Sequence, residues 1–134
     1  KQVQGLAEQF EVDGAPIGRD PSFAAAVTEA EIALETLEAF CARQLKGVAH
    51  GKVLGYEASL MKIRGSELLQ TLTGLAMTIA SRAGFRLPPE NAGSEAEAEL
   101  AGCLREYLLQ RAATIYGGSN EIQRNIVSKA HFGF

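Results

Sequence analysis

The stretch LGYEASLMKIRGSELLQTLTGLAMTI, residues 54–79, decides the fold. Its apolar residues recur at alternating three- and four-residue steps, the spacing of one face of an α-helix. This stripe consists of Leu54, Ala58, Met61, Gly65, Leu68, Leu72, Leu75 and Ile79. A second apolar set widens the surface well beyond one face and consists of Leu60, Ile63, Leu69 and Ala76. We therefore predict one long helix, from about Lys52 to Arg82, that contacts neighbours on two sides.

Two glycines, Gly65 and Gly74, lie inside this apolar helix. Each weakens a helix by about 1 kcal/mol relative to alanine. We interpret them as positions where a neighbouring helix approaches closely.

A second long helix is predicted upstream, from Pro21 to about Lys46. Asp20 is placed to cap it, and proline suits the first helical position because its missing N–H would have had no partner there. Its apolar stripe consists of Phe23, Val27, Ala30, Leu34, Leu37 and Cys41. Gly47 and the pair His50-Gly51 supply the stop.

The remaining segments are shorter. Residues 3–10 have the spacing of the last turns of a helix whose beginning lies upstream, and residues 12–18 are predicted to form a loop. A connector over residues 84–94 ends in Ser94, which is followed three residues later by Glu97 in the pattern of a capping box. A third helix is predicted from about Glu95 to Ala113, and a last one from near Asn120.

These long helices with short connections predict an all-α fold, an up-down antiparallel helical bundle. Few segments alternate as half-buried strands do, so β structure should be close to absent. The 134 residues fit a single domain. We expect it to be part of a longer chain, with the first helix truncated at Lys1.

Composition excludes several classes of protein. The chain is 46% hydrophobic and 22% charged with a formal net charge of −3, which is typical of a globular domain and gives no electrostatic reason to bind nucleic acid or an anionic membrane. We expect no membrane insertion, because no apolar run approaches about 20 residues. Cys41 and Cys103 are expected to be free thiols in the cytoplasm, and the separated His50 and His131 indicate no metal site.

The segment RAATIYGGSNEIQRNIV, residues 111–127, is the candidate for chemistry. A helix is interrupted by Gly117-Gly118, and a new helix begins with small polar residues. Free N–H groups at a helix start favour anionic or polar ligand groups, and glycine lets a ligand approach the backbone. The residues alone favour the simpler alternative, a helix-loop-helix corner capped by Ser119 or Asn120.

The run IYGGSNEIQR, residues 115–124, resembles the signature near the C-terminus of acyl-CoA dehydrogenases. The resemblance implies the family's C-terminal helical bundle, which surrounds FAD and an acyl-CoA thioester together with an N-terminal helical domain and a middle β domain. It implies that Gly118 contacts the substrate and that Ser119, Asn120 and Glu121 contact the flavin cofactor. It also implies a homo- or hetero-oligomer assembled through the bundle, and an electron-transfer partner that it does not specify.

Gly117 occupies the position at which many relatives carry the glutamate base. Glycine cannot accept a proton, so we expect no catalytic residue in this chain. Either the base lies on the upstream part of the first helix, as in some branches of the family, or this is a silent subunit beside an active one. Glu8, the only carboxylate on the residual helix, is interpreted as a solvated surface residue.

We therefore expect the C-terminal domain of an FAD-dependent acyl-CoA dehydrogenase, an enzyme of lipid metabolism. The domain would supply a wall of the flavin and substrate site and be inactive by itself. The alternatives are a non-catalytic partner subunit or structural oligomerisation module, and an unrelated helical interaction domain.

Overall fold

A computed structural model describes residues 1–84 and 93–133 of the chain. Its helices are α1 (Gln2–Gln9), α2 (Pro21–Ala49), α3 (Glu57–Arg82), α4 (Glu95–Leu109) and α5 (Asn120–Phe132). Two 3-10 turns, η1 (Ile17–Arg19) and η2 (Gln110–Thr114), and two short strands, β1 (Glu11–Val12) and β2 (Ala15–Pro16), complete the described part. The all-α prediction is confirmed.

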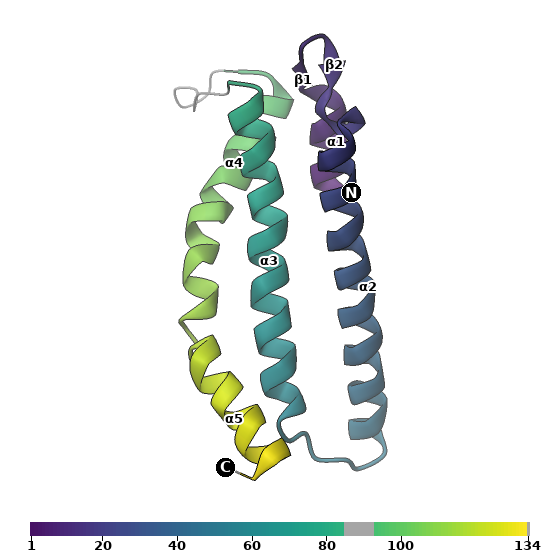
Figure 1. Ribbon diagram of the computed structural model, residues 1–134, viewed down its shortest axis with the longest axis vertical. Coiled ribbons are helices and arrows are strands. Elements are labelled where there is room, and N and C mark those ends of the chain that lie inside the picture. The colour runs from purple at the N-terminus through teal and green to yellow at the C-terminus, as the bar shows by residue number, and fades with distance from the viewer. Residues whose placement is uncertain (85–92, 134) are drawn as a thin grey trace.

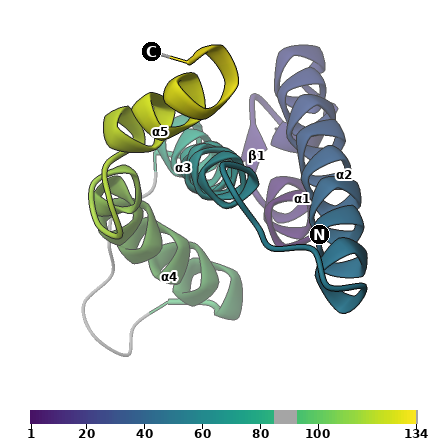
Figure 2. The ribbon, with the colours of Figure 1, turned by 90° about the horizontal axis from the view of Figure 1, so that it is seen from below.

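Helix α3 is the centre of the molecule. Helices α2 and α4 lie antiparallel to it on opposite sides, and α5 continues downward from α4 along the lower part of α3 (Figure 1). Seen from the end, α3 is surrounded by the other helices (Figure 2), and it contacts α1, α2, α4 and α5. The prediction that this helix touches neighbours on two sides is therefore confirmed.

The predicted helix starts depend on side-chain caps. Asp20 accepts a hydrogen bond from the Phe23 N–H at 2.9 Å, with proline in the first turn of α2. Ser94 and Glu97 form the predicted capping box at the start of α4. These caps satisfy N–H groups that have no partner inside the helix.

Several predicted boundaries were wrong. Helix α2 continues through Gly47 and ends at Ala49, and the positive-φ Gly51 follows its C-cap residue His50. Helix α3 begins five residues late, at Glu57, because residues 52–56 are needed to connect two antiparallel helices. Helix α4 ends at Leu109, and the rest of the predicted helix is the tighter turn η2.

The loop predicted over residues 12–18 contains part of a small hairpin. Strands β1 and β2 pair antiparallel, with Val12 opposite Ala15. Asp13 and Gly14 both have positive φ, 53° and 77°, which suits a two-residue hairpin turn. The predicted connector over residues 84–94 lies largely outside the described residues.

The core fills the half of the bundle nearest this hairpin. Its fully buried large side chains come from three helices and are Leu6, Ile79 and Leu100. Burying such a side chain stabilises the fold by roughly 1.5–3 kcal/mol. Toward the other end, α2 is poorly covered, with Leu45 69% exposed.

The interpretation of Gly65 and Gly74 as close-approach positions was wrong for contacts within this chain. A Cβ added at either glycine would meet no other atom within 4 Å.

Candidate functional site

The two glycines of the motif form a turn between η2 and α5. Gly117 has φ 66° and Gly118 has φ 86°, in the left-handed region that favours glycine. Both residues are exposed, and Gln123 Nε2 donates to the Gly117 carbonyl oxygen at 3.4 Å. A Cβ at Gly118 would lie 2.5 Å from Gln123 Nε2, whereas a Cβ at Gly117 would meet nothing within 4 Å.

Ser119 caps the N-terminus of α5. Its hydroxyl oxygen accepts a hydrogen bond from the Ile122 N–H at 3.5 Å. The aligned peptide dipoles place partial positive charge at this end of the helix. The glycine turn therefore leads directly into a helix N-terminus, which favours polar or anionic groups.

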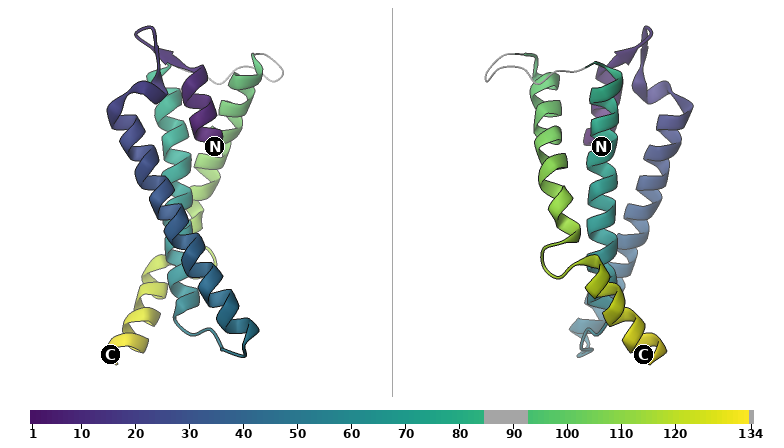
Figure 3. Two further views of the ribbon diagram at one scale, coloured as in Figure 1. Left: turned by 90° about the vertical axis from the view of Figure 1, so that its right-hand side faces the viewer. Right: turned by 60° about the vertical axis from the view of Figure 1, so that its left-hand side comes forward.

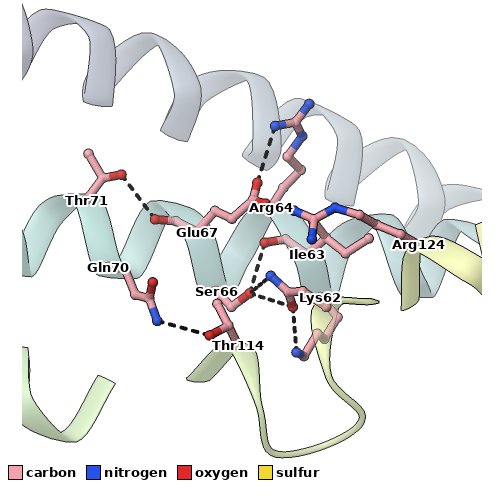
Figure 4. Close-up of polar contacts among 10 residues, drawn as sticks. Lys62, Ile63, Arg64, Ser66, Glu67, Gln70, Thr71, Thr114 and Arg124 are labelled. Atoms are coloured by element: carbon pink, nitrogen blue, oxygen red, sulfur yellow. Dashed lines mark hydrogen bonds and ion pairs between the residues drawn. The ribbon is translucent and has the colours of Figure 1, made fainter. Parts of the chain in front are cut away.

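Asn120 anchors this helix start to α3. Its side chain is buried, with the residue 3% exposed. Nδ2 donates to Ser66 Oγ at 3.1 Å, and Oδ1 accepts from Lys62 Nζ at 2.7 Å (Figure 4). Ser66 in turn donates to the Ile63 carbonyl oxygen at 2.9 Å. Each buried polar group thus has a partner of the right type, which such groups need.

Glu121 follows on the exposed side of α5. Its own backbone N–H, hydrogen-bonded to the carboxylate, lowers the pKa of Glu121. The Ser119 hydroxyl and the charges of Arg124 and Lys62 lower the pKa further. Glu121 is therefore ionised at neutral pH and is a weak proton acceptor.

A polar row on α3 holds the elements around the turn, and sequence reasoning missed it. Gln70 Nε2 donates to the Gln110 carbonyl oxygen at 2.9 Å, which fixes η2. Glu67 pairs with Arg124 of α5 and with Arg64 at 3.3 Å (Figure 4). A signal for this row was present in the sequence, because Lys62, Ser66 and Gln70 recur every four residues and so lie on one face of the helix.

The first inter-helix turn is also held by polar contacts. Lys52 Nζ lies 2.6 Å from Glu57 Oε1 and donates to Gln44 Oε1 at 3.1 Å. Gln44 is only 3% exposed. The hydrogen bond from Lys52 is the main cause that lowers the pKa of Glu57 to about 2. This cluster closes the α2–α3 connection.

Residues 1–132 of the chain match the protein family described as acyl-CoA dehydrogenase, C-terminal domain. The chain belongs to this family. It is 30% identical over 114 residues to the acyl-CoA dehydrogenase IpdE1 of Mycobacterium tuberculosis, covering 85% of this chain and 27% of that relative. It is 46% identical over 59 residues to the acyl-CoA dehydrogenase IpdE1 of Mycolicibacterium smegmatis, covering 44% and 13% respectively. No solved structure matches the chain significantly.

In this acyl-CoA dehydrogenase domain the expected site residues separate into two groups. Gly118 and Glu121 are exposed and Ser119 is half-buried at the same surface, whereas the Asn120 side chain points into the protein. Asn120 therefore fixes the position of its neighbours. Glu8 is exposed on α1, near the hairpin end of the bundle and away from α5 (Figure 1).

The described residues of the acyl-CoA dehydrogenase domain contain no disulfide, metal site or membrane span. Cys41 and Cys103 are free and half-buried. Burial, followed by the charges of Glu99 and Glu106, raises the pKa of the Cys103 thiol. Within residues 1–84 and 93–133 no cluster of His, Cys, Asp or Glu could hold a metal ion. Over the same ranges no helix is long and apolar enough to span a membrane.

Proposed function

We propose that this domain forms part of the flavin and substrate site of an FAD-dependent enzyme that dehydrogenates an acyl-CoA thioester between its α and β carbons. The observation that carries the proposal is the exposed turn Gly117-Gly118, in which both residues have positive φ and which leads directly into the capped start of α5. The chain that carries this turn belongs to the acyl-CoA dehydrogenase family.

The residues present fit a flat ring system at this turn. Gly118 has no side chain, so an acyl thioester or a flavin could approach its backbone on the side that the Gln123 amide leaves open. Ser119 and Glu121 offer a hydroxyl and a carboxylate beside it, at the positive end of α5. Asn120 holds this arrangement rigid through its contacts with Ser66 and Lys62. When bound, FAD would supply the hydride acceptor.

The proton acceptor is not among the turn residues. Gly117 has no titratable group, and the lowered pKa of Glu121 makes it a weak base. We infer that the base is a carboxylate supplied by a part of the polypeptide upstream of Lys1.

The chain spans 27% of the length of the Mycobacterium tuberculosis relative. We propose that an N-terminal helical domain and a β domain belong to the same longer polypeptide and enclose the cofactor together with this bundle. The exposed apolar residues of α2 would form the homo- or hetero-oligomer interface. The enzyme would act in the cytoplasm with a separate electron-transfer partner.

A second function, a non-catalytic partner subunit, is favoured by one observation, the glycine at position 117. The catalytic dehydrogenase and the non-catalytic partner subunit differ in whether the complete polypeptide carries a carboxylate base. The third alternative, an unrelated helical domain, is wrong because the chain belongs to the family.

The test is made on the complete polypeptide. We expect stoichiometric bound FAD and reduction of an artificial electron acceptor when acyl-CoA thioesters are supplied. The variant Gly118→Ala should weaken FAD retention or raise KM for the thioester. Gly51→Ala is the matched control, since Gly51 is an exposed glycine with φ 87° in a distant turn. A polypeptide that binds FAD yet oxidises no thioester would favour the partner-subunit function, and one that never binds FAD would overturn the proposal.

A further inference from the structure

The side chain of Gln123 folds back over the glycine turn that precedes its own helix. Gln123 lies in the first turn of α5, where its backbone N–H donates to the Ser119 carbonyl oxygen at 2.9 Å. Side chains on an α-helix tilt toward the helix N-terminus, which brings the Gln123 amide within reach of the turn. Its Nε2 donates to the Gly117 carbonyl oxygen at 3.4 Å. A neutral amide on α5 thus contacts one peptide of the turn.

The helix that carries Gln123 is itself fixed to α3. Asn120, at the start of α5, is buried and donates to Ser66 of α3 at 3.1 Å. Arg124, which follows Gln123, pairs with Glu67 of α3 (Figure 4). In the views of Figure 3, α5 accordingly lies along the lower part of α3. The Gln123 amide therefore reaches the turn from a support that is anchored on both sides of it in sequence.

The contact with Gln123 determines which way the peptide between Gly117 and Gly118 faces. The described part of the chain contains no cis peptide bond. In a trans peptide the carbonyl and the N–H point in opposite directions. Because the Gly117 carbonyl points toward Gln123, the Gly118 N–H points away from it. Glycine adopts positive and negative φ with similar ease, so the turn residues alone would not fix this direction.

The Gly118 N–H is available to a ligand. No acceptor within residues 1–84 and 93–133 receives a hydrogen bond from it, and Gly118 is exposed. A backbone N–H is a strong donor that needs an acceptor once it is removed from water. The other side of Gly118 is occupied, because a Cβ there would lie 2.5 Å from Gln123 Nε2. A ligand acceptor therefore reaches this N–H from the side away from Gln123.

We propose that Gln123 is a positioning residue, whose amide directs the Gly118 N–H toward a carbonyl oxygen of the ligand bound at this turn. The inference rests on the proposed function, in which an acyl thioester and a flavin approach Gly118. Both groups carry carbonyl oxygens that accept hydrogen bonds. Gln123 touches neither group in this role, and acts only through the Gly117–Gly118 peptide.

Gln123→Glu in the complete polypeptide gives the test. At neutral pH a carboxylate has nearly the shape of the amide but cannot donate a hydrogen bond. Its negative charge near the N-terminus of α5 favours the helix, so the thermal unfolding midpoint should be unchanged or higher. Ligand binding should nevertheless weaken by about three- to tenfold, the scale of one lost hydrogen bond.

Two binding measurements distinguish the source of the carbonyl oxygen. If it belongs to the thioester, the dissociation constant of acetyl-CoA should rise and kcat/KM for longer acyl-CoA thioesters should fall. Acetyl-CoA has no β carbon and so is not dehydrogenated, and free coenzyme A, which lacks the thioester carbonyl, should bind as it does to the parent. If the carbonyl belongs to the flavin, the dissociation constant of FAD should rise instead.

Two further variants separate the hydrogen bond from the added charge. Gln123→Met removes the donor without adding charge and should show the same weakened binding. Asn125→Asp is the matched control, because it adds the same charge at an exposed position of α5, and it should keep the affinities of the parent.

The inference is overturned if Gln123→Glu and Gln123→Met keep the parent affinities for FAD and acetyl-CoA and the parent kcat/KM. Weaker binding of free coenzyme A together with a lower unfolding midpoint in both variants would also overturn it, because Gln123 would then only stabilise the fold. Equal losses in Asn125→Asp would assign the effect to charge. A parent polypeptide that binds no FAD would instead contradict the proposed function, and this inference with it.

Discussion

Asn120 Nδ2 lies 3.1 Å from Ser66 Oγ, so the first residue of α5 is joined to the middle of α3 across 54 residues of sequence. Gln70, one turn farther along α3, holds η2 on the other side of the glycine turn. The turn is therefore fixed at both ends to one helix, while its own residues Gly117 and Gly118 remain exposed.

Asn120→Ala should lower the free energy of unfolding by about 1–3 kcal/mol, because it removes the amide that donates to the buried Ser66 hydroxyl and accepts from Lys62. Urea denaturation measures the change, and hydrogen exchange should speed up in α5. Asn125→Ala is the control, since Asn125 is exposed on the same helix. Equal stability of the two variants would contradict the anchoring role.

Alanine at the two motif glycines should be destabilising to different extents. Each replacement forces a side chain into the left-handed region at a cost of about 1–2 kcal/mol. Gly118→Ala should be the worse, because its Cβ would displace the Gln123 amide. Gly65→Ala should instead stabilise α3 by about 1 kcal/mol, because the site is helical and open. Thermal unfolding of the three variants checks this order.

Gly117→Glu should partly replace a missing base in the complete enzyme. If the natural base lies upstream, removing it should abolish turnover, and Gly117→Glu in that background should restore part of it. Space allows the change, since a Cβ at Gly117 meets nothing within 4 Å, although φ is 66°. A double variant that folds, keeps FAD and stays inactive would show that position 117 does not face the substrate α carbon.

Acid should destabilise the chain partly through Asp20. Hydrogen bonds from the Ser22 hydroxyl and the Phe23 N–H, then Arg82, lower the pKa of Asp20 from 3.8 to about 2. A depressed pKa contributes stability that is present above the unfolded value and is lost as pH falls through the folded value. Asp20→Asn keeps a capping side chain without a titrating group, so its unfolding midpoint should fall less steeply between pH 5 and pH 2. Parallel curves for variant and parent would refute this.

The 134-residue chain should self-associate. Ile32 and Leu45 of α2 are 60% and 69% exposed, and contact with a second copy of the chain would remove such apolar side chains from water. Sedimentation equilibrium should show dimers or larger species at micromolar concentrations, and Leu45→Glu should shift the distribution toward monomer. A clean monomer for the parent chain would count against an interface on α2.

The sequence by itself determined the helices and most of their beginnings. Apolar spacing follows directly from the helical period, and caps such as Asp20 and Ser94 act within three residues of chain. The motif around Gly117 and Gly118 was likewise visible, and their positive φ angles agree with the glycine-specific turn it indicated.

Only the tertiary structure decided what the polar residues near the motif do. Asn120 could be seen as a cap or as a cofactor contact, and its burial against Ser66 depends on packing between helices that are distant in sequence. The same holds for the short connection before Glu57, where the antiparallel docking of α2 and α3 overrides an apolar pattern that continues through Leu54. Local periodicity sets which residues are helical, but the energy of a buried polar contact depends on the partner that the fold brings to it.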